Sequence, residues 1–474
     1  MSQKKKLSSY SILAIIILAL VALSWIVALV SPDSGVVGAT LGDFTMSIFN
    51  GFQDAMDVCV FVFVLGGFLA IVAKTGALDT GIAALVKKLN GKEEILIAVL
   101  MFVFSIGGTT YGMWEETVPF YLLLATTMYI AGFDTVVGAA TVCLGAGVGV
   151  LGSTINPFAT GIAMSTAVDS GVTVNSGLVM ALGAIIWLTS YAIALFFVLK
   201  YAKKVKADKG STILSLQEQE NMKELGKNIS TEKVELTGKQ KGVLIAFALT
   251  FIIMICGFIP WVDLGIIDAD IADAGTHWSA FLTGSCFGYW WFGEASTWFL
   301  IMSIVVALIG GLSESDYVDN FVKGAGDMMG VVLVVAVARG ASVIMGTTGL
   351  TDWILAACAS ILQGVSEFLF APLAYILYLP LSFFIPSSSG LATVSMPIMA
   401  PLTKTLGFAP EVMILIFSAA NGLVNLIAPT AGALMGGLSI SKVDWTTWVK
   451  FVGKVLLVIA IANIVILTAA MFIL

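Results

Sequence analysis

Long apolar runs separated by short polar stretches make up most of the chain. A helix needs about 20 residues to cross the hydrocarbon core of a bilayer. Runs of this kind predict about nine crossings, at residues 11–30, 54–73, 134–166, 174–199, 242–259, 298–312, 327–346, 409–438 and 445–471. The pattern is therefore typical of an all-α polytopic membrane protein.

Two further apolar segments, 93–131 and 367–404, are too long for one crossing, and each is interrupted near its middle. The interruptions read GGTTYGMWEE at residues 107–116 and PSSSG at residues 386–390. Irregular backbone is tolerated at membrane depth only where it is buried in protein or lines a wet cavity. We therefore expect each segment to form a re-entrant hairpin that enters and leaves the membrane on one side.

The composition narrows the class of protein further. Of the 474 residues, 59% are hydrophobic and only 11% are charged, whereas charged residues make up about 25% of a typical soluble domain. The net charge of −7 gives no indication of a nucleic-acid partner. The five cysteines lack metal-site spacing, and His277 is the only histidine. We therefore expect no metal, no cofactor and no catalytic residues.

The distribution of lysines indicates how the chain is oriented. Three lysines at residues 4–6 precede the first run, and the polar stretch 200–241 carries many more, so both are expected in the cytoplasm. Segment 260–297 has no lysine or arginine and is expected outside, whereas Lys404 is an exception on the predicted outer side. This orientation places the N-terminus in the cytoplasm and the C-terminus outside a bacterial cytoplasmic membrane.

The two halves of the chain resemble each other at a fixed shift in sequence. Matched positions include Gly51 with Gly324, Asp54 with Asp327, and TGALD (75–79) with TGLTD (348–352). Farther along, with small gaps, LGSTINP (151–157) matches GLVNLIAP (422–429). The predicted crossings run through the membrane in opposite directions in the two copies, and inverted repeats with discontinuous helices indicate a midplane substrate site in secondary transporters. The predicted parts are an N-terminal span (1–44), a first inverted repeat (45–199), a cytoplasmic linker (200–241), connecting spans with an external loop (242–316) and a second inverted repeat (317–474).

Four interruptions are expected to meet near the middle of the membrane: the two hairpin tips and the breaks at 151–157 and 421–430. A helix that restarts after a break presents unpaired N–H groups and a partial positive charge, which suit a carboxylate. The candidate substrate-binding residues are Thr109, Thr110, Trp114, Glu115, Glu116, Asn156, Ser387, Ser388, Ser389 and Asn425. The alternative is that the breaks serve only to pack helices closely.

Glu115 and Glu116 place two adjacent carboxylates at the first tip. An acidic residue at a helix centre costs about 2.5–3.5 kcal/mol on the insertion scale, so at least one of them needs a cation, a proton or water. The opposite tip carries only hydroxyls. This asymmetry indicates a ligand with a cationic end and a carboxylate end, such as a basic amino acid, with Trp114 and Tyr111 able to cover the cation. A structural ion pair is the alternative role for the glutamates.

Arg339 is the only arginine and lies within the predicted crossing 327–346. We expect it to support the site by an ion pair with one of the tip glutamates or with Asp327. Snorkelling toward the outer face and binding of a substrate carboxylate are the alternatives. Asp54 and Asp327 begin matched crossings and are expected to cap them, and Asp134 is expected to begin a helix as well.

Four stretches carry a resemblance to a known family: GTTYGMWEETVPF (108–120), GSTINPFATGIA (152–163), VAVARG (335–340) with MGTTGLTD (345–352), and FFIPSSSGLATVSMPIMAPL (383–402). They resemble YfcC-type members of the ion transporter superfamily, which are related to DcuC-type C4-dicarboxylate carriers. The arginine/ornithine antiporters of Gram-positive bacteria look most similar within this group. The resemblance implies a homodimeric elevator, in which a transport domain carries the substrate between hairpins and broken helices and moves against a fixed scaffold. Sodium-coupled relatives carry paired Ser-Asn-Thr motifs at both tips, and neither tip here has the Asn.

Together these observations predict a secondary transporter in the lipid bilayer that exchanges arginine for ornithine. Lysine or another basic species is an alternative substrate. A carrier of C4-dicarboxylates or other organic anions, coupled to sodium or protons, is the main alternative function. An intramembrane hydrolase would need Ser389 as its nucleophile, with the distant His277 as its only histidine base. A passive channel agrees less well with two closed hairpins.

Overall fold

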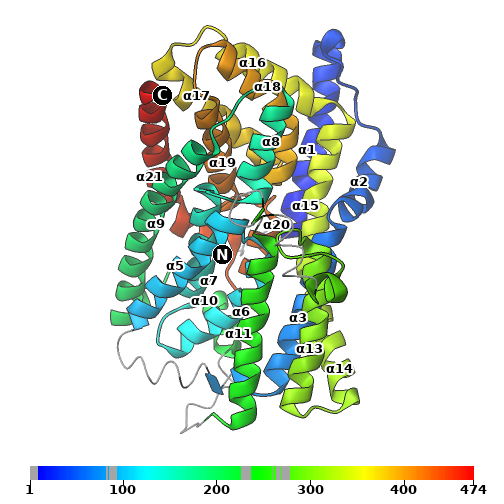
Figure 1. Cartoon of the computed structure of the whole chain (residues 1–474), viewed down its shortest axis with the longest axis vertical. Coiled ribbons are helices and arrows are strands. Elements are labelled where there is room, and N and C mark those ends of the chain that lie inside the picture. The colour runs from blue at the N-terminus through cyan, green and yellow to red at the C-terminus, as the bar shows by residue number, and fades with distance from the viewer. Residues whose placement is uncertain are drawn as a thin grey trace, which may run out of the picture.

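The computed structural model describes residues 9–78, 93–225, 236–259 and 278–474, with positions 80, 81, 84, 261, 262 and 268 between them. These residues form helices and connecting segments without a β-strand (Figure 1). His277 and the lysines at 4–6 lie outside the described residues. The helical content confirms the predicted all-α class.

Most of the helices follow the apolar runs of the sequence, whereas α10 and α14 are polar. The helix bounds are α1 Ser9–Val30, α2 Leu41–Asp54, α3 Met56–Lys74, α5 Glu93–Tyr111, α6 Val118–Ile130, α7 Thr135–Leu151, α8 Ile162–Asp169, α9 Ser176–Ala207, α10 Leu216–Leu225, α11 Gly238–Phe258, α13 Phe292–Gly310, α14 Glu314–Asp327, α15 Met329–Thr347, α16 Leu350–Leu362, α17 Glu367–Phe384, α18 Ser388–Thr405, α19 Pro410–Asn425, α20 Gly432–Ile440 and α21 Trp445–Ile473. One-turn elements η2 (Glu115–Thr117) and η3 (Pro157–Gly161) lie at two of the predicted breaks.

Nine described helical segments are long and apolar enough to cross a membrane. This number agrees with the predicted number of crossings, but some of the helices that reach this length are not the segments predicted to cross. The first arms of the predicted hairpins, α5 and α17, reach this length, whereas α7 and α19 do not. The predicted crossings 134–166 and 409–438 are each divided into two helices, because the chain breaks after Leu151 and after Asn425. The helix predicted to begin at 327 continues an earlier one, so that 314–347 forms one long span.

Each predicted interruption is a break between helices. Residues 112–114 separate α5 from η2 and α6, and residues 385–387 separate α17 from α18. In Figure 1, α5 and α6 lie in the lower half of the molecule, and α17 and α18 lie in the upper half. Each segment therefore turns back within one half of the molecule, but its re-entry into a membrane stays a prediction.

The matched halves meet in an antiparallel arrangement. Helix α2 packs on α15 and α3 packs on α14, so the two long segments pass each other in opposite directions. Glycines permit this approach, since a Cβ added at Gly51 would lie 2.7 Å from the Gly340 nitrogen, and one added at Gly324 would overlap the Gly66 carbonyl oxygen. The turns after α3 and α15 also match, because Gly76 and Gly349 both have positive φ, 69° and 75°.

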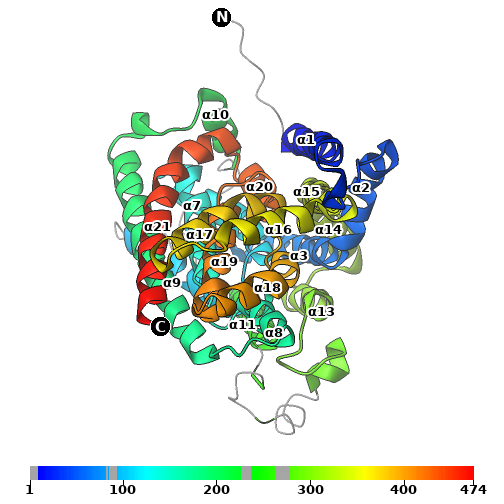
Figure 2. The same cartoon turned by 90° about the horizontal axis from the view of Figure 1, so that it is seen from above.

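Two groups of helices make up the molecule. The first, which we call the long-helix bundle, contains α1–α3, α11 and α13–α15. The second, the hairpin bundle, contains α5–α9 and α17–α21, with α7 and α19 packed together at its centre. Figure 2 shows α7, α9, α19 and α21 on one side and α1, α2, α14 and α15 on the other. Helix α16 connects the two bundles, and the candidate site lies between them.

The structure corrects two of the three predicted helix caps. Asp54 and Asp327 are the last residues of α2 and α14, and the following helices have Ala55 and Met328 at their N-cap positions, without a side-chain cap. Asp134 does cap α7, because its carboxylate accepts a hydrogen bond from the Val137 N–H at 3.1 Å. A single residue separates the helices at each of the two matched junctions, which leaves no extended N-cap position for an aspartate.

The predicted linker is attached to the hairpin bundle over its first part. Thr212 donates a hydrogen bond to the Asp134 carboxylate at 2.6 Å, next to the start of α7. Farther along, buried Glu218 of α10 accepts hydrogen bonds from the Asp444 N–H at 2.8 Å and the Thr447 hydroxyl at 3.1 Å, at the start of α21. Residues 208–225 thus contact the start of α7 in the first half and the start of α21 in the second half. We call these residues the strap.

Glu218 gives a pH-dependent test of the strap. Burial acts to raise the pKa of Glu218, but hydrogen bonds from Ser215, Asp444 and Thr447 outweigh it and hold the pKa below the ordinary value of 4.5. The ionised Glu218 carboxylate therefore stabilises the folded protein fully above the unfolded-state pKa. This stabilisation is lost as the pH falls through the lowered folded-state pKa. We expect Glu218→Gln to cost about 1–2 kcal/mol near pH 7. In thermal unfolding, the difference from wild type should shrink below pH 4.5, and an equal difference at all pH values would contradict this account.

Candidate substrate site

A cavity of about 490 Å³ lies between the two bundles and brings both hairpin tips together. Its size falls within the range of about 300–1,000 Å³ found for small-molecule sites. Its polar lining consists mainly of Asp54, Asp57, Trp114, Glu115, Glu116, Asn156, Arg339, Ser342, Thr351, Asp352, Ser387, Ser388, Ser389 and Asn425. Eight of the ten predicted substrate-binding residues line this cavity. They are Trp114, Glu115, Glu116, Asn156, Ser387, Ser388, Ser389 and Asn425.

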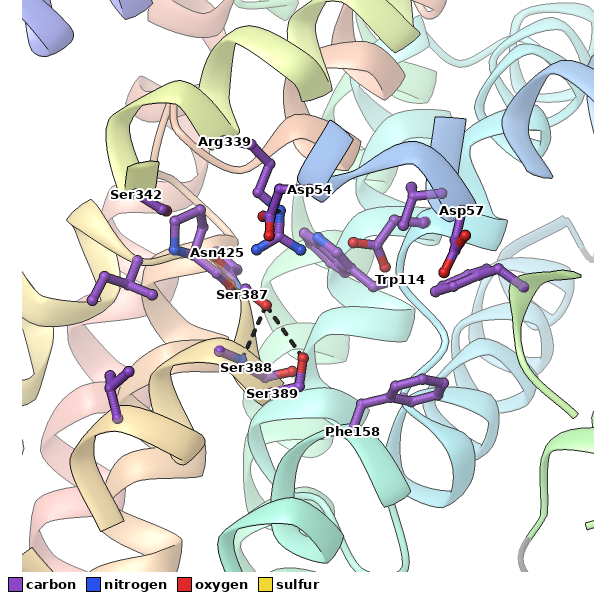
Figure 3. A pocket seen from close by; sticks show the side chains of 18 of the residues that line it. Asp54, Asp57, Trp114, Phe158, Arg339, Ser342, Ser387, Ser388, Ser389 and Asn425 are labelled. Atoms are coloured by element: carbon purple, nitrogen blue, oxygen red, sulfur yellow. Dashed lines mark hydrogen bonds and ion pairs between the residues drawn. The ribbon is translucent and has the colours of Figure 1, made fainter. Parts of the chain in front are cut away.

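The charged groups around the cavity are mostly acidic. Five carboxyl groups and one guanidinium line it. Figure 3 shows Arg339 and Asp54 side by side at one edge, with the three serines of the second tip below them. Within the described residues, no group of three histidine, cysteine or acidic side chains is placed to hold a metal ion. The surplus of carboxylates makes the cavity suited to an organic cation.

Arg339 forms its ion pair with a residue that the sequence did not suggest. Its Nε lies 3.4 Å from Oδ2 of Asp54, so the expected direct pair with Glu115, Glu116 or Asp327 is wrong. The pairing follows from the packing of α2 against α15, which brings the end of α2 to the middle of α15. Asp54 therefore acts as a partner of Arg339 at the cavity edge instead of a helix cap.

The two glutamates of the first tip differ in their surroundings. Glu116 is 1% exposed, and its Oε2 accepts a hydrogen bond from the Trp114 N–H at 3.0 Å. One carboxylate oxygen of Glu116 thus holds the irregular turn itself. Glu115 is half-buried and also lines a small side cavity of about 40 Å³ that Arg339 shares. Of the two, Glu115 is better placed to contact a ligand.

The second tip presents hydroxyls and a helix start. Ser387 caps α18, because its Oγ accepts a hydrogen bond from the Gly390 N–H at 3.2 Å. The Ser387 and Ser389 hydroxyls lie 3.3 Å apart and form a further hydrogen bond, as Figure 3 shows. The backbone N–H groups of Ser388 and Ser389 lie in the first turn of α18, where N–H groups have no acceptor within the helix. This arrangement can bind a carboxylate through amide and hydroxyl donors.

Asn425 joins the second tip to the break after α19. Its Nδ2 donates to the Pro386 carbonyl at 2.9 Å and to Oδ1 of Asn421 at 3.2 Å. Its own Oδ1 is buried at the cavity and makes no hydrogen bond within the described part of the chain. An unused acceptor of this kind can take a hydrogen bond from an ammonium group.

The matching residue in the first half, Asn156, is used differently. Its Oδ1 accepts from the Phe158 N–H at 2.9 Å and the Ala159 N–H at 3.3 Å, and its Nδ2 donates to Ser153 at 2.9 Å. Asn156 therefore caps the one-turn helix η3 at the edge of the cavity. Its predicted contact with substrate stays a prediction, but both ends of its amide already have partners.

Thr109, Thr110 and Tyr111 lie outside the cavity lining. The Thr109 hydroxyl donates to the Gly152 carbonyl at 2.7 Å, and the Thr110 hydroxyl donates within its own helix. The Tyr111 ring is fully buried and stacks on Phe258, with ring centroids 5.7 Å apart. Thr109 thus ties the first tip to the break after α7, and Tyr111 packs behind the tip.

The sequence did not single out two carboxylates of the lining. Asp57 lies one turn beyond Asp54, in the first turn of α3, and Asp352 lies at the start of α16. Asp352 belongs to the repeated TGLTD stretch and follows a glycine in the left-handed conformation, Gly349. An acidic residue next to a helix break within an apolar chain was the available signal in both cases.

One protein family matches this chain almost from end to end. The family described as "DcuC: C4-dicarboxylate anaerobic carrier" matches residues 6–472. The chain belongs to the DcuC family. This membership makes it a membrane transporter, in agreement with its helices, and confirms the DcuC part of the predicted resemblance.

Two curated relatives of this DcuC family member are bacterial proteins. An "Uncharacterized protein" of Haemophilus influenzae is 31% identical over 432 residues, which cover 89% of this chain and 78% of that protein. The "Putative basic amino acid antiporter YfcC" of Escherichia coli is 28% identical over 414 residues, which cover 85% of this chain and 75% of that protein. The predicted resemblance to YfcC-type proteins is thereby confirmed.

Two solved structures resemble the chain of this DcuC family member at lower identity. Neisseria gonorrhoeae MtrF, from work on a class of antimetabolite efflux pumps, is 17% identical with a TM-score of 0.46, and the match covers 100% of this chain and 96% of MtrF. The Alcanivorax borkumensis YdaH transporter is 14% identical with a TM-score of 0.47, covering 98% of each chain.

Proposed function

We propose that the protein exchanges arginine for ornithine across the bacterial cytoplasmic membrane. The observation that carries the proposal is the charge of the cavity, where five carboxyl groups accompany one guanidinium. A cationic amino acid compensates part of this surplus, whereas a dicarboxylate adds to it. Both substrates have the same amino-acid head and a cationic side chain, so one site serves both in turn.

The two tips bind opposite ends of the substrate in this proposal. The side-chain cation lies near Glu115, where Trp114 covers it. The α-carboxylate lies at the start of α18, with Ser388 and Ser389 as donors, and the α-ammonium group donates to the unused Oδ1 of Asn425. The name of the YfcC relative, "Putative basic amino acid antiporter YfcC", supports the same substrate class.

The arrangement of the helices supports an elevator mechanism. The hairpin bundle holds both tips and both breaks, and it faces the long-helix bundle across the cavity. We propose that α5–α6 and α17–α18 are re-entrant hairpins and that the hairpin bundle moves against the long-helix bundle, which forms the scaffold of a homodimer. The repeats at 45–199 and 317–474 then supply one hairpin from each face, with the N-terminus in the cytoplasm and the C-terminus outside.

The test is counterflow in vesicles containing only the purified protein. We expect vesicles loaded with ornithine to accumulate labelled arginine, and external lysine or ornithine to compete, while succinate does not. The control is the same vesicles without loaded amino acid. Uptake that succinate blocks and arginine does not would overturn the proposal.

A second candidate is a carrier of C4-dicarboxylates or other organic anions coupled to sodium or protons. The family description favours it, as do Arg339 and the hydroxyl-rich start of α18. In that case Arg339 binds a substrate carboxylate, and one of the acidic residues binds the coupling cation. Succinate uptake driven by a sodium or proton gradient in the same vesicles would select this function.

A further inference from the structure

We infer that Arg339 makes exchange obligatory by holding the empty carrier in place. This inference rests on the proposed exchange of basic amino acids. Arg339 lies in the middle of α15, in the long-helix bundle, and is the only arginine of the chain. Its side chain lines the same cavity as the tip glutamates, so a cationic residue of the protein occupies the site proposed for a cationic substrate.

Arg339 and Glu115 belong to different bundles. Asp54, which pairs with Nε of Arg339 at 3.4 Å, lies in the long-helix bundle with it. Glu115 lies at the tip of the hairpin bundle and shares two cavities with Arg339, the main one of about 490 Å³ and the side cavity of about 40 Å³. The attraction between Arg339 and Glu115 therefore acts across the boundary between the two bundles.

The Asp54 pair leaves much of the guanidinium available. The contact with Asp54 uses Nε, and a guanidinium offers five N–H donors in a planar fork. The Arg339 side chain is still 23% exposed and lines the cavity. It can therefore remain paired with Asp54 while it compensates the charge of Glu115.

The absence of substrate then opposes movement of the hairpin bundle. If that bundle moves with its site empty, Glu115 separates from Arg339 and becomes an uncompensated charge in a poorly solvated place, which is costly. A bound arginine or ornithine moves with Glu115 and supplies the compensating charge itself. Only the loaded carrier then moves readily, and this is the condition for strict exchange.

The test compares two fluxes of labelled ornithine from preloaded vesicles, one into buffer without substrate and one into buffer with arginine. For wild type, efflux into substrate-free buffer should be slow and arginine should accelerate it. We expect Arg339→Gln to raise efflux into substrate-free buffer about tenfold or more, because a barrier difference of about 1.4 kcal/mol gives a factor of ten. Exchange should be reduced much less, so the ratio of the two fluxes should approach one.

Matched variants separate the charge of Arg339 from a structural role. Arg339→Lys keeps a cation and should retain slow net efflux. Lys404→Gln removes a cation that bonds to the Gly171 carbonyl at 3.1 Å, away from the cavity, and should behave as wild type. If Arg339→Gln does not give monodisperse protein, Arg339→Met replaces it, with an apolar stem of similar length and the same expectation.

The outcomes distinguish this inference from the proposed function. Equally slow net efflux in Arg339→Gln and wild type would contradict the inference while leaving exchange intact. A parallel loss of both fluxes would also contradict it, because it would indicate a structural role. A lack of arginine–ornithine exchange in wild-type vesicles would instead overturn the proposed function, and with it this inference.

Discussion

Arginine binding is expected to be lost in Glu115→Gln and largely kept in Glu116→Gln. Glu115 faces both cavities, whereas one oxygen of Glu116 is already bonded to the Trp114 N–H at 3.0 Å. A glutamine oxygen can still accept that bond, so the turn should survive in Glu116→Gln. Removing one partner of a desolvated charge pair costs about 2–5 kcal/mol, which corresponds to a loss of affinity of roughly 30-fold or more.

Calorimetry on detergent-purified protein would measure both affinities. The two variants control for each other, since each removes one carboxylate from the same tip without changing its size. Normal affinity in both variants would contradict the charge argument as a whole. Loss of binding only in Glu116→Gln would reverse the roles that the structure suggests for the two residues.

Gly108→Val is expected to prevent the hairpin bundle from folding. Gly108 lies where α5 meets α7, and an added Cβ would lie 2.9 Å from the Val150 nitrogen and 3.0 Å from the Gly149 Cα. Those atoms belong to backbone that cannot move aside as a flexible side chain does. Overpacking in a well-packed core costs about 1–3 kcal/mol and sometimes more, and we expect the upper end or beyond here.

Size-exclusion profiles and thermal unfolding of the purified protein measure this effect. Gly453→Val is the matched control, because Gly453 lies inside α21 and an added Cβ there meets no atom within 4 Å in the described structure. The control should give monodisperse protein with a midpoint near that of wild type. Wild-type behaviour of Gly108→Val would show that the contact between α5 and α7 is looser than described.

The helix breaks were predictable from sequence because they carry a local signal. Glycine, proline, serine and asparagine interrupt otherwise continuous apolar runs, and all four predicted positions are breaks between helices. The cavity lining followed from these breaks for the two tips and for Asn156 and Asn425. Local chemistry thus located the site even though no single residue pattern defined it.

The remaining errors concern partners that only packing decides. The pairing of Arg339 with Asp54 depends on how α2 meets α15, and a sequence offers no measure of that distance. Thr109 was placed in the site because it lies at a tip, but a hydroxyl at a tip can equally face the neighbouring break, as its bond to Gly152 shows. Side-chain direction at an irregular turn follows from contacts with other segments, not from position in the chain.

The strap has a consequence for how the two halves are held together. Helix α10 follows the first half in the chain, yet through Glu218 it binds the start of α21 in the second half. In addition to the packing of their helices, the halves are thus joined covalently and by the hydrogen bonds of Glu218. A polypeptide severed between residues 225 and 236 would keep Glu218 on its N-terminal fragment, so two fragments made independently could still associate through this contact as well as through the packing of their helices.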